Sequence, residues 1–274
     1  MLAALIIVFR EVFEAGLIVG IVLAATQAVA HRSRWVSGGV AAGVFGACLV
    51  AVFAGALSAA FAGAGQELFN AAVLSVAVVM LTWHNVWMSR HGRELAAEIR
   101  AAGESVVTGR TTLAALAVVI GVAVLREGAE VVLFLYGILA SGGTSGMSVL
   151  LGGLFGLALG ALVCWLTYVG MLRIPARHLF AVTSLMIAFL AAGMAAQAVQ
   201  FLAQADVLTA FDSMVWDTSW LLSDGSVPGK ALHTLIGYND RPTAMQLAVY
   251  VATLLVMFVL MRMFAPEQKP ASAH

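Results

Sequence analysis

Two charged motifs of the same form interrupt apolar stretches of this chain. REVFE covers Arg10–Glu14 and REGAE covers Arg126–Glu130, and runs of Ala, Leu, Val and Ile flank both. On a helix, glutamates three residues apart lie on nearly the same face, and an arginine four residues before a glutamate can reach its carboxylate. Each motif is therefore expected to present a pair of carboxylates with a guanidinium beside them.

The chemistry that such groups support is the binding of a cation. The two motifs together contain four glutamates: Glu11, Glu14, Glu127 and Glu130. If the motifs face each other, they offer up to eight oxygens, which suit hard, highly charged cations, whereas soft ions prefer sulfur. Four carboxylates and the guanidiniums of Arg10 and Arg126 sum to a charge of −2. A divalent ion balances this charge and a trivalent ion exceeds it by one unit. We expect the arginines to keep the glutamates ionised and to prevent binding that is too tight for release.

Two other interpretations of the motifs stay open at this point. An Arg–Glu pair within one helix can be a packing device, although two copies with one spacing favour a shared site. A di-iron carboxylate enzyme typically combines Glu-x-x-His pairs with further glutamates, whereas both motifs here are Glu-x-x-Glu. The leading hypothesis is a transport site rather than an enzyme. Carboxylates alone do not choose among cations such as Mn²⁺ or Pb²⁺.

The composition indicates that the motifs lie within a membrane. Of the 274 residues, 62% are hydrophobic and only 10% are charged, and the mean hydropathy is +1.00. A soluble domain carries about 25% charged residues, so this chain cannot cover a globular surface with charge. A charge near the bilayer centre costs roughly 3 kcal/mol or more. The charged groups of the motifs must therefore face one another, water or an ion.

The apolar stretches predict an all-α, polytopic membrane protein with seven transmembrane helices, since about 20 apolar residues cross a bilayer. The predicted spans are 2–30, 36–61, 67–88, 112–140, 147–171, 178–204 and 243–264. The segment 205–242 is too polar to span and is predicted to be an external loop. The chain, 1–274, is expected to form a single membrane domain.

The distribution of Lys and Arg predicts the orientation, because cytoplasmic loops carry an excess of them. With the N-terminus outside, ten of them fall on the cytoplasmic side: Arg32, Arg34, Arg90, Arg93, Arg100, Arg110, Arg173, Arg177, Arg262 and Lys269. Only Lys230 and Arg241 fall outside. We expect an external N-terminus, a cytoplasmic C-terminus and a location in the cytoplasmic (inner) membrane.

Weaker similarities recur near the offset that separates the motifs. The motifs are 116 residues apart, GVFG at Gly43 matches GLFG at Gly153, and ELFNAAV at Glu67 matches HLFAVTS at His178. The order of these matches, more than any one of them, predicts an internal repeat.

The repeat gives the membrane domain its expected architecture. The first repeat is 1–90, the second is 112–204, and the seventh helix, 243–264, is an addition outside them. Because each repeat has three spans, the second enters the membrane from the opposite side, as in many secondary transporters. This inversion is expected to bring both motifs to corresponding depths around one centre.

Paired RExxE motifs in the first and fourth of seven helices resemble the oxidase-dependent iron permease family, the fungal high-affinity iron permeases and their bacterial homologues. The resemblance covers essentially the whole chain, including SVPGKALHTLIGY before the last span. It implies a permease for ferric iron, which is the transported ion rather than a bound cofactor. It also implies the residues that bind the iron, with the two arginines beside them: Glu11, Glu14, Glu127, Glu130, Arg10 and Arg126.

The same resemblance implies partner proteins. Fungal members of the family pair with a multicopper ferroxidase, and bacterial members pair with periplasmic iron-handling or iron-oxidising proteins. We therefore expect extracytoplasmic iron-binding or iron-oxidising proteins to act with this chain in the lipid bilayer. No nucleic acid partner is expected.

Polar residues near the inner end of the third span are candidates for the ion pathway. His84 and Asn85 lie in TWHNVW. They could line the exit of the pathway, or they could anchor the helix at the membrane interface beside Trp83 and Trp87.

Two further groups of polar residues are candidates for the pathway. Gln197, Gln200 and Gln204 follow helical spacing on the sixth span, where they mark either a wet face or hydrogen bonds between helices. Among five external aspartates, Asp217 is the candidate for gathering ions at the mouth, although DTSW is also an ordinary turn or cap sequence. FDSMVWDTSWLL, residues 211–222, predicts an amphipathic helix at the outer interface.

Overall fold

The structure is a computed structural model that describes residues 1–60, 65–141, 144–170, 176–208, 211 and 213–264. In these ranges the chain is helical, with turns and one isolated bridge between Met214 and Thr243. The helices are α1 (Leu2–Ala25), α2 (Arg32–Ala60), α3 (Gln66–Val107), α4 (Leu113–Ala140), α5 (Gly146–Tyr168), α6 (Ala176–Gln204), α7 (Val227–Ile236) and α8 (Ala244–Met263). Six of the residues used to predict the orientation lie wholly or partly outside the described part of the chain. Arg173 and Lys269 are not described, and for four others only the backbone is described: Arg90, Arg93, Arg177 and Lys230.

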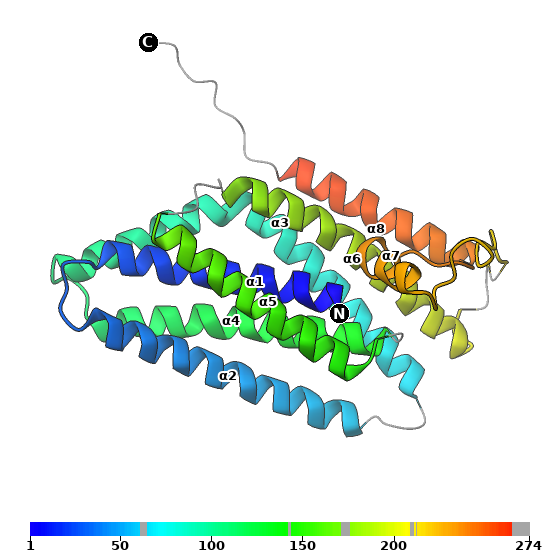
Figure 1. Cartoon of the computed structure of the whole chain (residues 1–274), viewed down its shortest axis with the longest axis horizontal. Helices are drawn as coiled ribbons and strands as arrows, with labels where there is room; N and C mark the ends of the chain where they lie inside the picture. The colour runs from blue at the N-terminus through cyan, green and yellow to red at the C-terminus, as the bar shows by residue number, and fades with distance from the viewer. Residues whose placement is uncertain (61–64, 142–143, 171–175, 209–210, 212, 265–274) are drawn as a thin grey trace, which may run out of the picture.

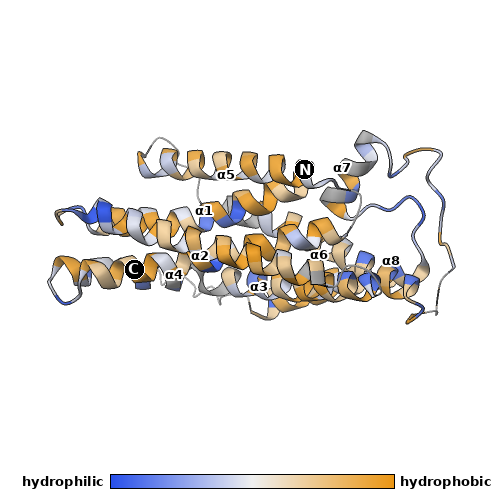
Figure 2. Cartoon of the chain, turned by 90° about the horizontal axis from the view of Figure 1, so that it is seen from below, coloured by the Kyte–Doolittle hydropathy of each residue, from blue (hydrophilic) through white to orange (hydrophobic). Residues whose placement is uncertain are grey.

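The long helices lie side by side in an elongated bundle (Figure 1). Hydrophobic residues dominate the middle of the helices, and hydrophilic residues gather toward the helix ends and in the connections (Figure 2). Among the described residues, five segments are long and apolar enough to cross a membrane: Arg32–Leu57, Gln66–Met88, Gly146–Tyr168, Val182–Gln204 and Ala244–Met263. The helices α1 and α4 are not in this set. They have 24 and 28 residues, but each carries the three charges of one RExxE motif.

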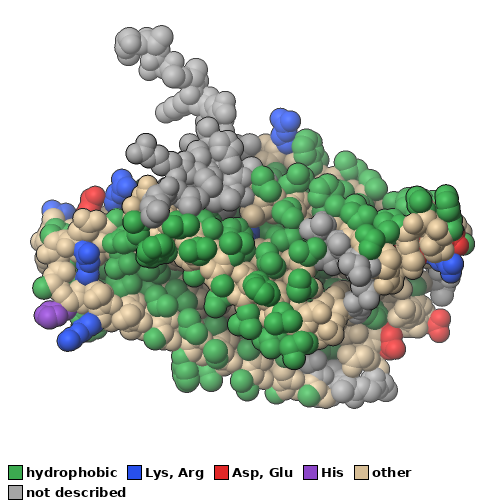
Figure 3. All heavy atoms as spheres, in the orientation of Figure 1, with side chains coloured by type: hydrophobic (Ala, Val, Ile, Leu, Met, Phe, Trp, Pro, Cys, Tyr) green, Lys and Arg blue, Asp and Glu red, His purple; other side chains and the backbone are tan. Residues whose placement is uncertain are grey.

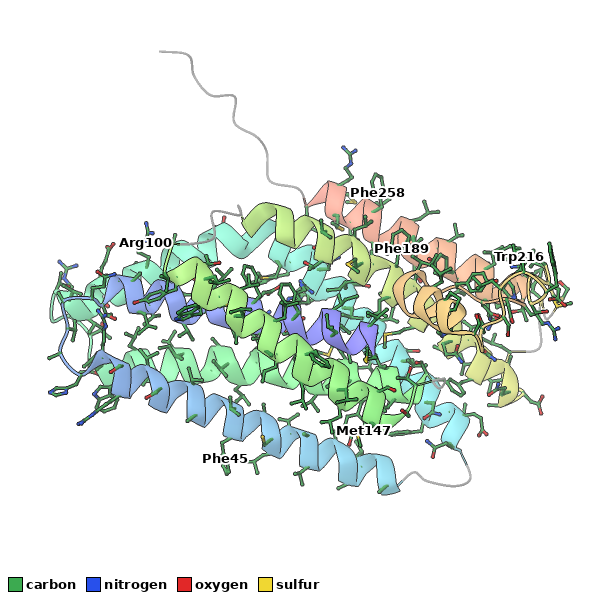
Figure 4. All side chains as sticks on the ribbon, in the orientation of Figure 1. Phe45, Arg100, Met147, Phe189, Trp216 and Phe258 are labelled. Atoms are coloured by element: carbon green, nitrogen blue, oxygen red, sulfur yellow. The ribbon has the colours of Figure 1, made fainter. Side chains whose placement is uncertain are left out.

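Large apolar side chains cover the outside of the bundle. Phe45 on α2 and Phe258 on α8 point away from it (Figure 4) and are 66% and 58% exposed. Figure 3 shows a broad band of hydrophobic side chains, with Lys and Arg gathered at the end where α1 terminates. Soluble monomers rarely expose apolar patches of this extent, so the surface suits lipid.

Glycines bring two pairs of helices into close contact. A Cβ added at Gly156 of α5 would lie 2.6 Å from the carbonyl oxygen of Leu5 on α1. A Cβ added at Gly43 of α2 would lie 2.7 Å from the carbonyl oxygen of Gly121 on α4. Small residues allow helix backbones to approach this closely in membranes. Thus α5 packs directly on α1, and α2 packs directly on α4.

Two apolar clusters fill the bundle on either side of its middle. One includes Ile7, Leu81 and Phe134, which are fully buried. The other includes Ile18 and Val124. Early residues of α1 therefore share a cluster with late residues of α4, so these helices run antiparallel, as Figure 1 also shows. Both RExxE motifs lie between the clusters.

The external segment between α6 and α8 differs from the predicted one. The described residues of the stretch 211–222 are not helical. They are extended or turned, because Met214 pairs with Thr243 and the Thr218 N–H donates to the Asp240 carbonyl oxygen at 2.9 Å. The predicted amphipathic helix there is wrong.

The helix of this segment is instead α7, which has clear start and stop signals. The Ser226 hydroxyl accepts from the Gly229 N–H at 3.0 Å, and Pro228 lies in the first turn. Gly237 ends the helix with φ +68°, a left-handed conformation that favours glycine. A capping serine and a closing glycine therefore decide where the helix forms.

Candidate metal centre

The motif on α1 is fully inside the bundle. Arg10 and Glu11 are each 1% exposed and Glu14 is 4% exposed. The Arg10 Nε lies 2.8 Å from Glu14 Oε1, and its Nη1 lies 3.6 Å from Glu11 Oε1. The i, i+4 ion pair predicted from the sequence is present, and one guanidinium serves both carboxylates.

The motif on α4 repeats this arrangement with a more exposed arginine. The Arg126 Nε lies 3.1 Å from Glu130 Oε1, and the guanidinium lies over the Trp87 ring, 4.9 Å from its centre. Glu127 and Glu130 are buried, whereas the Arg126 side chain is 44% exposed. The two arginines therefore differ in environment, although their spacing in the sequence is identical.

His84 of α3 joins the two motifs. Its Nε2 lies 3.2 Å from Glu14 Oε2, and its Nδ1 lies 2.6 Å from Glu130 Oε2. The ring is buried, and Nε2 also lies 4.0 Å from Glu11 Oε2. His84 was expected to line the pathway near the inner end of a span, and its side chain lies among the glutamates.

Four side chains from three helices offer ligand atoms that lie within 4.8 Å of one another: Glu11, His84, Glu127 and Glu130. Glu14, the remaining glutamate, contacts both Arg10 and His84 beside this group. Several buried oxygens of the group have no hydrogen-bond donor among the described residues, including both oxygens of Glu11. Buried carboxylate oxygens without donors are costly. A bound cation would satisfy them, so the donor set fits a metal ion.

The face of α3 carries a signal that points to His84. Leu74, Ala77 and Leu81 are fully or almost fully buried, and His84 continues their spacing of three and four residues. A histidine on the buried face of a membrane helix needs polar partners in the interior. That pattern, read from the sequence, predicts that His84 faces the centre.

Asn85 is buried beside His84 but belongs to a different contact. Its Nδ2 donates to the Ser184 carbonyl oxygen at 3.2 Å and lies 4.0 Å from Met261 Sδ. Asn85 therefore connects α3 with α6 and α8 and does not join the four-residue group.

The two pathway glutamines lie in different surroundings. Gln197 lines a small cavity near the start of α1. The Gln200 Oε1 accepts from Gln246 Nε2 of α8 at 3.1 Å, which is a hydrogen bond between helices. Gln200 therefore forms a hydrogen bond between helices, whereas Gln197 faces a cavity.

Asp217 forms a turn in the external segment. Its Oδ1 accepts from the Ser219 hydroxyl at 2.6 Å and from the Ser219 N–H at 3.0 Å, and its Oδ2 lies 3.2 Å from the Arg241 Nε. The Ser219 hydrogen bonds, helped by Arg241, hold the pKa of the Asp217 carboxyl below its usual value. The contacts are those of the ordinary turn that DTSW also suggested.

Comparisons with known proteins identify the family of the chain. The chain matches the model of the Iron permease FTR1 family over residues 1–267. The ferrous iron permease EfeU of Escherichia coli O6:H1 (strain CFT073) is 34% identical over 268 residues, covering 95% of this chain and 96% of that protein. The permease of the same name from Shigella sonnei (strain Ss046) is 33% identical with the same coverage. The one from Yersinia pestis is 31% identical over 278 residues, covering 100% of this chain and 96% of that protein.

No solved structure matches the chain. The relatives are named as permeases, which are transporters and not enzymes, and five apolar helices fit a multi-pass membrane protein. The family model spans nearly the whole chain. The chain is therefore an iron transporter of the membrane and belongs to the Iron permease FTR1 family.

Proposed function

We propose that this chain carries iron across the cytoplasmic membrane through the buried centre between α1, α3 and α4. In this proposal the iron ligands come from Glu11, Glu14, Glu127 and Glu130, together with His84. The observation that carries it is the convergence of four ligand side chains from three helices, with buried oxygens that lack donors. Arg10 and Arg126 lie beside the carboxylates and balance part of their charge.

In the proposed architecture α1 and α4 also cross the membrane, which gives seven spans. Their lengths are sufficient, since a helix of about 20 residues crosses the hydrocarbon layer. Arg10 and the four glutamates are buried and face one another inside the bundle, which makes them tolerable at this depth. Arg126 is 44% exposed and lies over the Trp87 ring, with its Nε 3.1 Å from Glu130. The excess of Lys and Arg in the predicted cytoplasmic connections favours an external N-terminus and a cytoplasmic C-terminus.

The proposed inverted repeat is supported by equivalent contacts in the two halves. Gly156 packs on Leu5, and Gly43 packs on Gly121, which lies 116 residues after Leu5. The contacts one helical turn earlier have the same offset of 116 residues. Gly152 meets the carbonyl oxygen of Met1, and Gly39 meets that of Ala117, again 116 residues later. The contacts match Gly43 with Gly156 rather than with Gly153.

Three observations favour Fe²⁺ over Fe³⁺ in the centre. The charge of −2 on four carboxylates and two guanidiniums is balanced by a divalent ion, and an imidazole nitrogen suits a borderline metal better than a hard trivalent ion. The relatives described above are named ferrous iron permeases. The family resemblance instead implied ferric iron. If iron arrives in that form, an extracytoplasmic electron donor must reduce each ion by one electron before entry.

The apolar clusters close the proposed site on both sides. Ile7 and Phe134 lie one helical turn from Glu11 and Glu130, toward the start of α1. Ile18 and Val124 lie on the opposite side of the motifs. We infer that the centre is occluded here, and that iron enters or leaves when one cluster separates. Such separation of packed helices around a fixed site is how alternating access works.

Uptake of ⁵⁵Fe by proteoliposomes tests the proposal. Wild type is compared with Glu127→Gln and with Glu98→Gln, a control change at an exposed glutamate of α3. We expect Glu127→Gln to lower the uptake rate by about tenfold or more, because metal affinity depends on each charged ligand, and Glu98→Gln to match wild type. Equal uptake in all three would contradict the proposal.

The same liposomes test the choice of ion. Iron is supplied as Fe²⁺ with ascorbate or as Fe³⁺ with citrate, and Mn²⁺ or Pb²⁺ is added as competitor. Faster uptake with ascorbate supports Fe²⁺. If Mn²⁺ or Pb²⁺ enters in preference to both forms of iron, the chain is a permease for another cation.

A further inference from the structure

A small cavity lies at the end of the bundle where α1 begins and α4 ends. It has a volume of about 40 Å³, enough for two or three water molecules. Its polar lining comes from Ser141, Thr144, Gln197 and His233, over an apolar wall that includes Ala3. Four polar side chains from three parts of the chain therefore converge on one water-sized space.

His233 is oriented as metal-binding histidines are. Its Nδ1 lies 2.7 Å from the carbonyl oxygen of Tyr238. A carbonyl only accepts, so Nδ1 carries the proton and Nε2 keeps a free lone pair. Metal ligands of this type typically donate their other ring N–H to a backbone carbonyl or carboxylate, which fixes the ring.

The helix that carries His233 is held firmly against the bundle. Gly237, which ends α7, packs on Gly193 of α6 so closely that a Cβ at Gly193 would lie 2.9 Å from the Gly237 Cα. Gly193 also lines the cavity. The ring is therefore fixed at the cavity wall by the capped helix and by the Tyr238 carbonyl.

The cavity lies along the bundle from the buried centre and is separated from it by one apolar layer. Ala3 precedes Glu11 by eight residues and Ile138 follows Glu130 by eight, which at 1.5 Å per residue is about 12 Å along both helices. Leu81 and Phe134, which are fully buried, belong to the intervening cluster.

We propose that this cavity is a second, outer binding site for a divalent transition-metal ion, with His233 Nε2 as its nitrogen ligand. The Gln197 side-chain oxygen and the hydroxyls of Ser141 and Thr144 supply oxygen ligands. The role of the site is to hold iron before the apolar layer opens, and only this role rests on the proposed function. Its polar ligands are neutral, so it binds more weakly than the glutamate centre and releases the ion inward.

An acidic group beside His233 favours cations at this end. Asp224 interacts electrostatically with His233, and its buried Oδ1 has no donor among the described residues. The Asp224 N–H donates to Asp240 Oδ2 at 3.1 Å, so a second carboxyl lies next to it. These two carboxyls lie just before and just after α7, the helix that carries His233, and raise the local concentration of cations at this end.

Titration of the purified full-length protein with Co²⁺ tests the outer site separately from the inner one. The background is Glu127→Gln with Glu130→Gln, which disables the buried centre. We expect this protein to bind one Co²⁺ with the absorption spectrum of a nitrogen-ligated ion. We expect His233→Gln or Gln197→Ala in the same background to weaken binding by about tenfold or more. The control is His31→Asn at the opposite end, where φ is +60° and Asn is tolerated.

Unchanged Co²⁺ affinity in both the His233→Gln and Gln197→Ala proteins, or no Co²⁺ binding in the background protein, overturns the outer site. Size-exclusion chromatography checks that each variant is folded, and Gln197→Ala leaves α7 intact. In proteoliposomes whose protein has the intact glutamate centre, His233→Gln is expected to raise the half-saturating Fe²⁺ concentration for uptake severalfold, with little change in the maximal uptake rate. If wild type takes up no iron, the proposed function fails, while the Co²⁺ titration still decides the outer site.

Discussion

The Nδ1 of His84 lies 2.6 Å from Glu130 Oε2, so a residue of α3 contacts the motif of α4 directly. Its other ring nitrogen lies 3.2 Å from Glu14 of α1. One imidazole therefore touches both RExxE motifs, and three helices meet at a single side chain.

Replacing His84 is expected to reduce both the rate of transport and its selectivity. The His84→Gln variant keeps a polar side chain but removes the nitrogen ligand that distinguishes transition metals from Mg²⁺ and Ca²⁺. We expect ⁵⁵Fe uptake to fall by about tenfold or more, and excess Ca²⁺ to inhibit the remaining uptake more strongly than it inhibits wild type. The Asn85→Gln variant, next to it but outside the four-residue group, is the comparison. Wild-type resistance to Ca²⁺ in His84→Gln would show that the imidazole does not select the ion.

The two motif arginines are expected to differ in their effect on stability. Arg10 is 1% exposed and serves two buried carboxylates, so Arg10→Gln leaves uncompensated buried charge and costs about 3 kcal/mol or more. Arg126 is 44% exposed and lies 3.1 Å from one carboxylate oxygen, so its loss is expected to cost less than the loss of Arg10. Thermal unfolding in detergent measures the difference. Similar unfolding midpoints for the Arg10→Gln and Arg126→Gln variants would contradict the difference in environment between the two arginines.

Glycine substitutions test whether the two halves are equivalent. Gly43→Ala and Gly156→Ala each place a Cβ within 2.7 Å of a backbone oxygen of the neighbouring helix, so each is expected to destabilise by about 1–3 kcal/mol. Gly20→Ala is the control, because a Cβ there meets nothing within 4 Å. The unfolding midpoint is again the measurement. A large effect at only one of the two glycines would argue against an inverted repeat.

Asp217 is expected to stabilise the external turn without taking part in transport. Its carboxyl has a folded-state pKa below the unfolded value because of Ser219 and Arg241. Its contribution is therefore complete above the unfolded pKa of about 4 and is lost as the pH falls through the lower folded value. The protection factor of the Ser219 amide in hydrogen exchange, which corrects for the intrinsic pH dependence of exchange, should be constant from pH 5 to 8 and fall only below about pH 4. Asp217→Asn should leave iron uptake within about twofold of wild type; a larger loss would return Asp217 to the ion pathway.

Much of the site could be predicted because RExxE is a local pattern. The i, i+4 spacing of Arg10 with Glu14 and of Arg126 with Glu130 brings each pair together whatever the rest of the chain does. The same holds for helix positions, since long apolar stretches give α2, α5 and α8 nearly the predicted bounds. Local chemistry and length were sufficient there.

Other features depend on contacts between distant segments, and the sequence patterns were ambiguous for them. His84 was expected near the inner end of a span ending at 88, and the apolar part of α3 does end at Met88, although the helix continues to Val107. The contacts of the His84 ring with Glu14 and Glu130 come from other helices. The stretch 211–222 has amphipathic spacing, yet its pairing with Thr243 and Asp240 prevents a helix. Glycines recur so often in α5 that similarity alone could not choose between Gly153 and Gly156 as the partner of Gly43.

The central claim is that both motifs and His84 bind one iron ion, and an anomalous-difference map of crystals grown with Fe²⁺ under anaerobic conditions tests it most directly. The account predicts that the strongest iron peak lies among Glu11, His84, Glu127 and Glu130. A strongest peak elsewhere, with these four side chains unliganded at saturating iron, would contradict it.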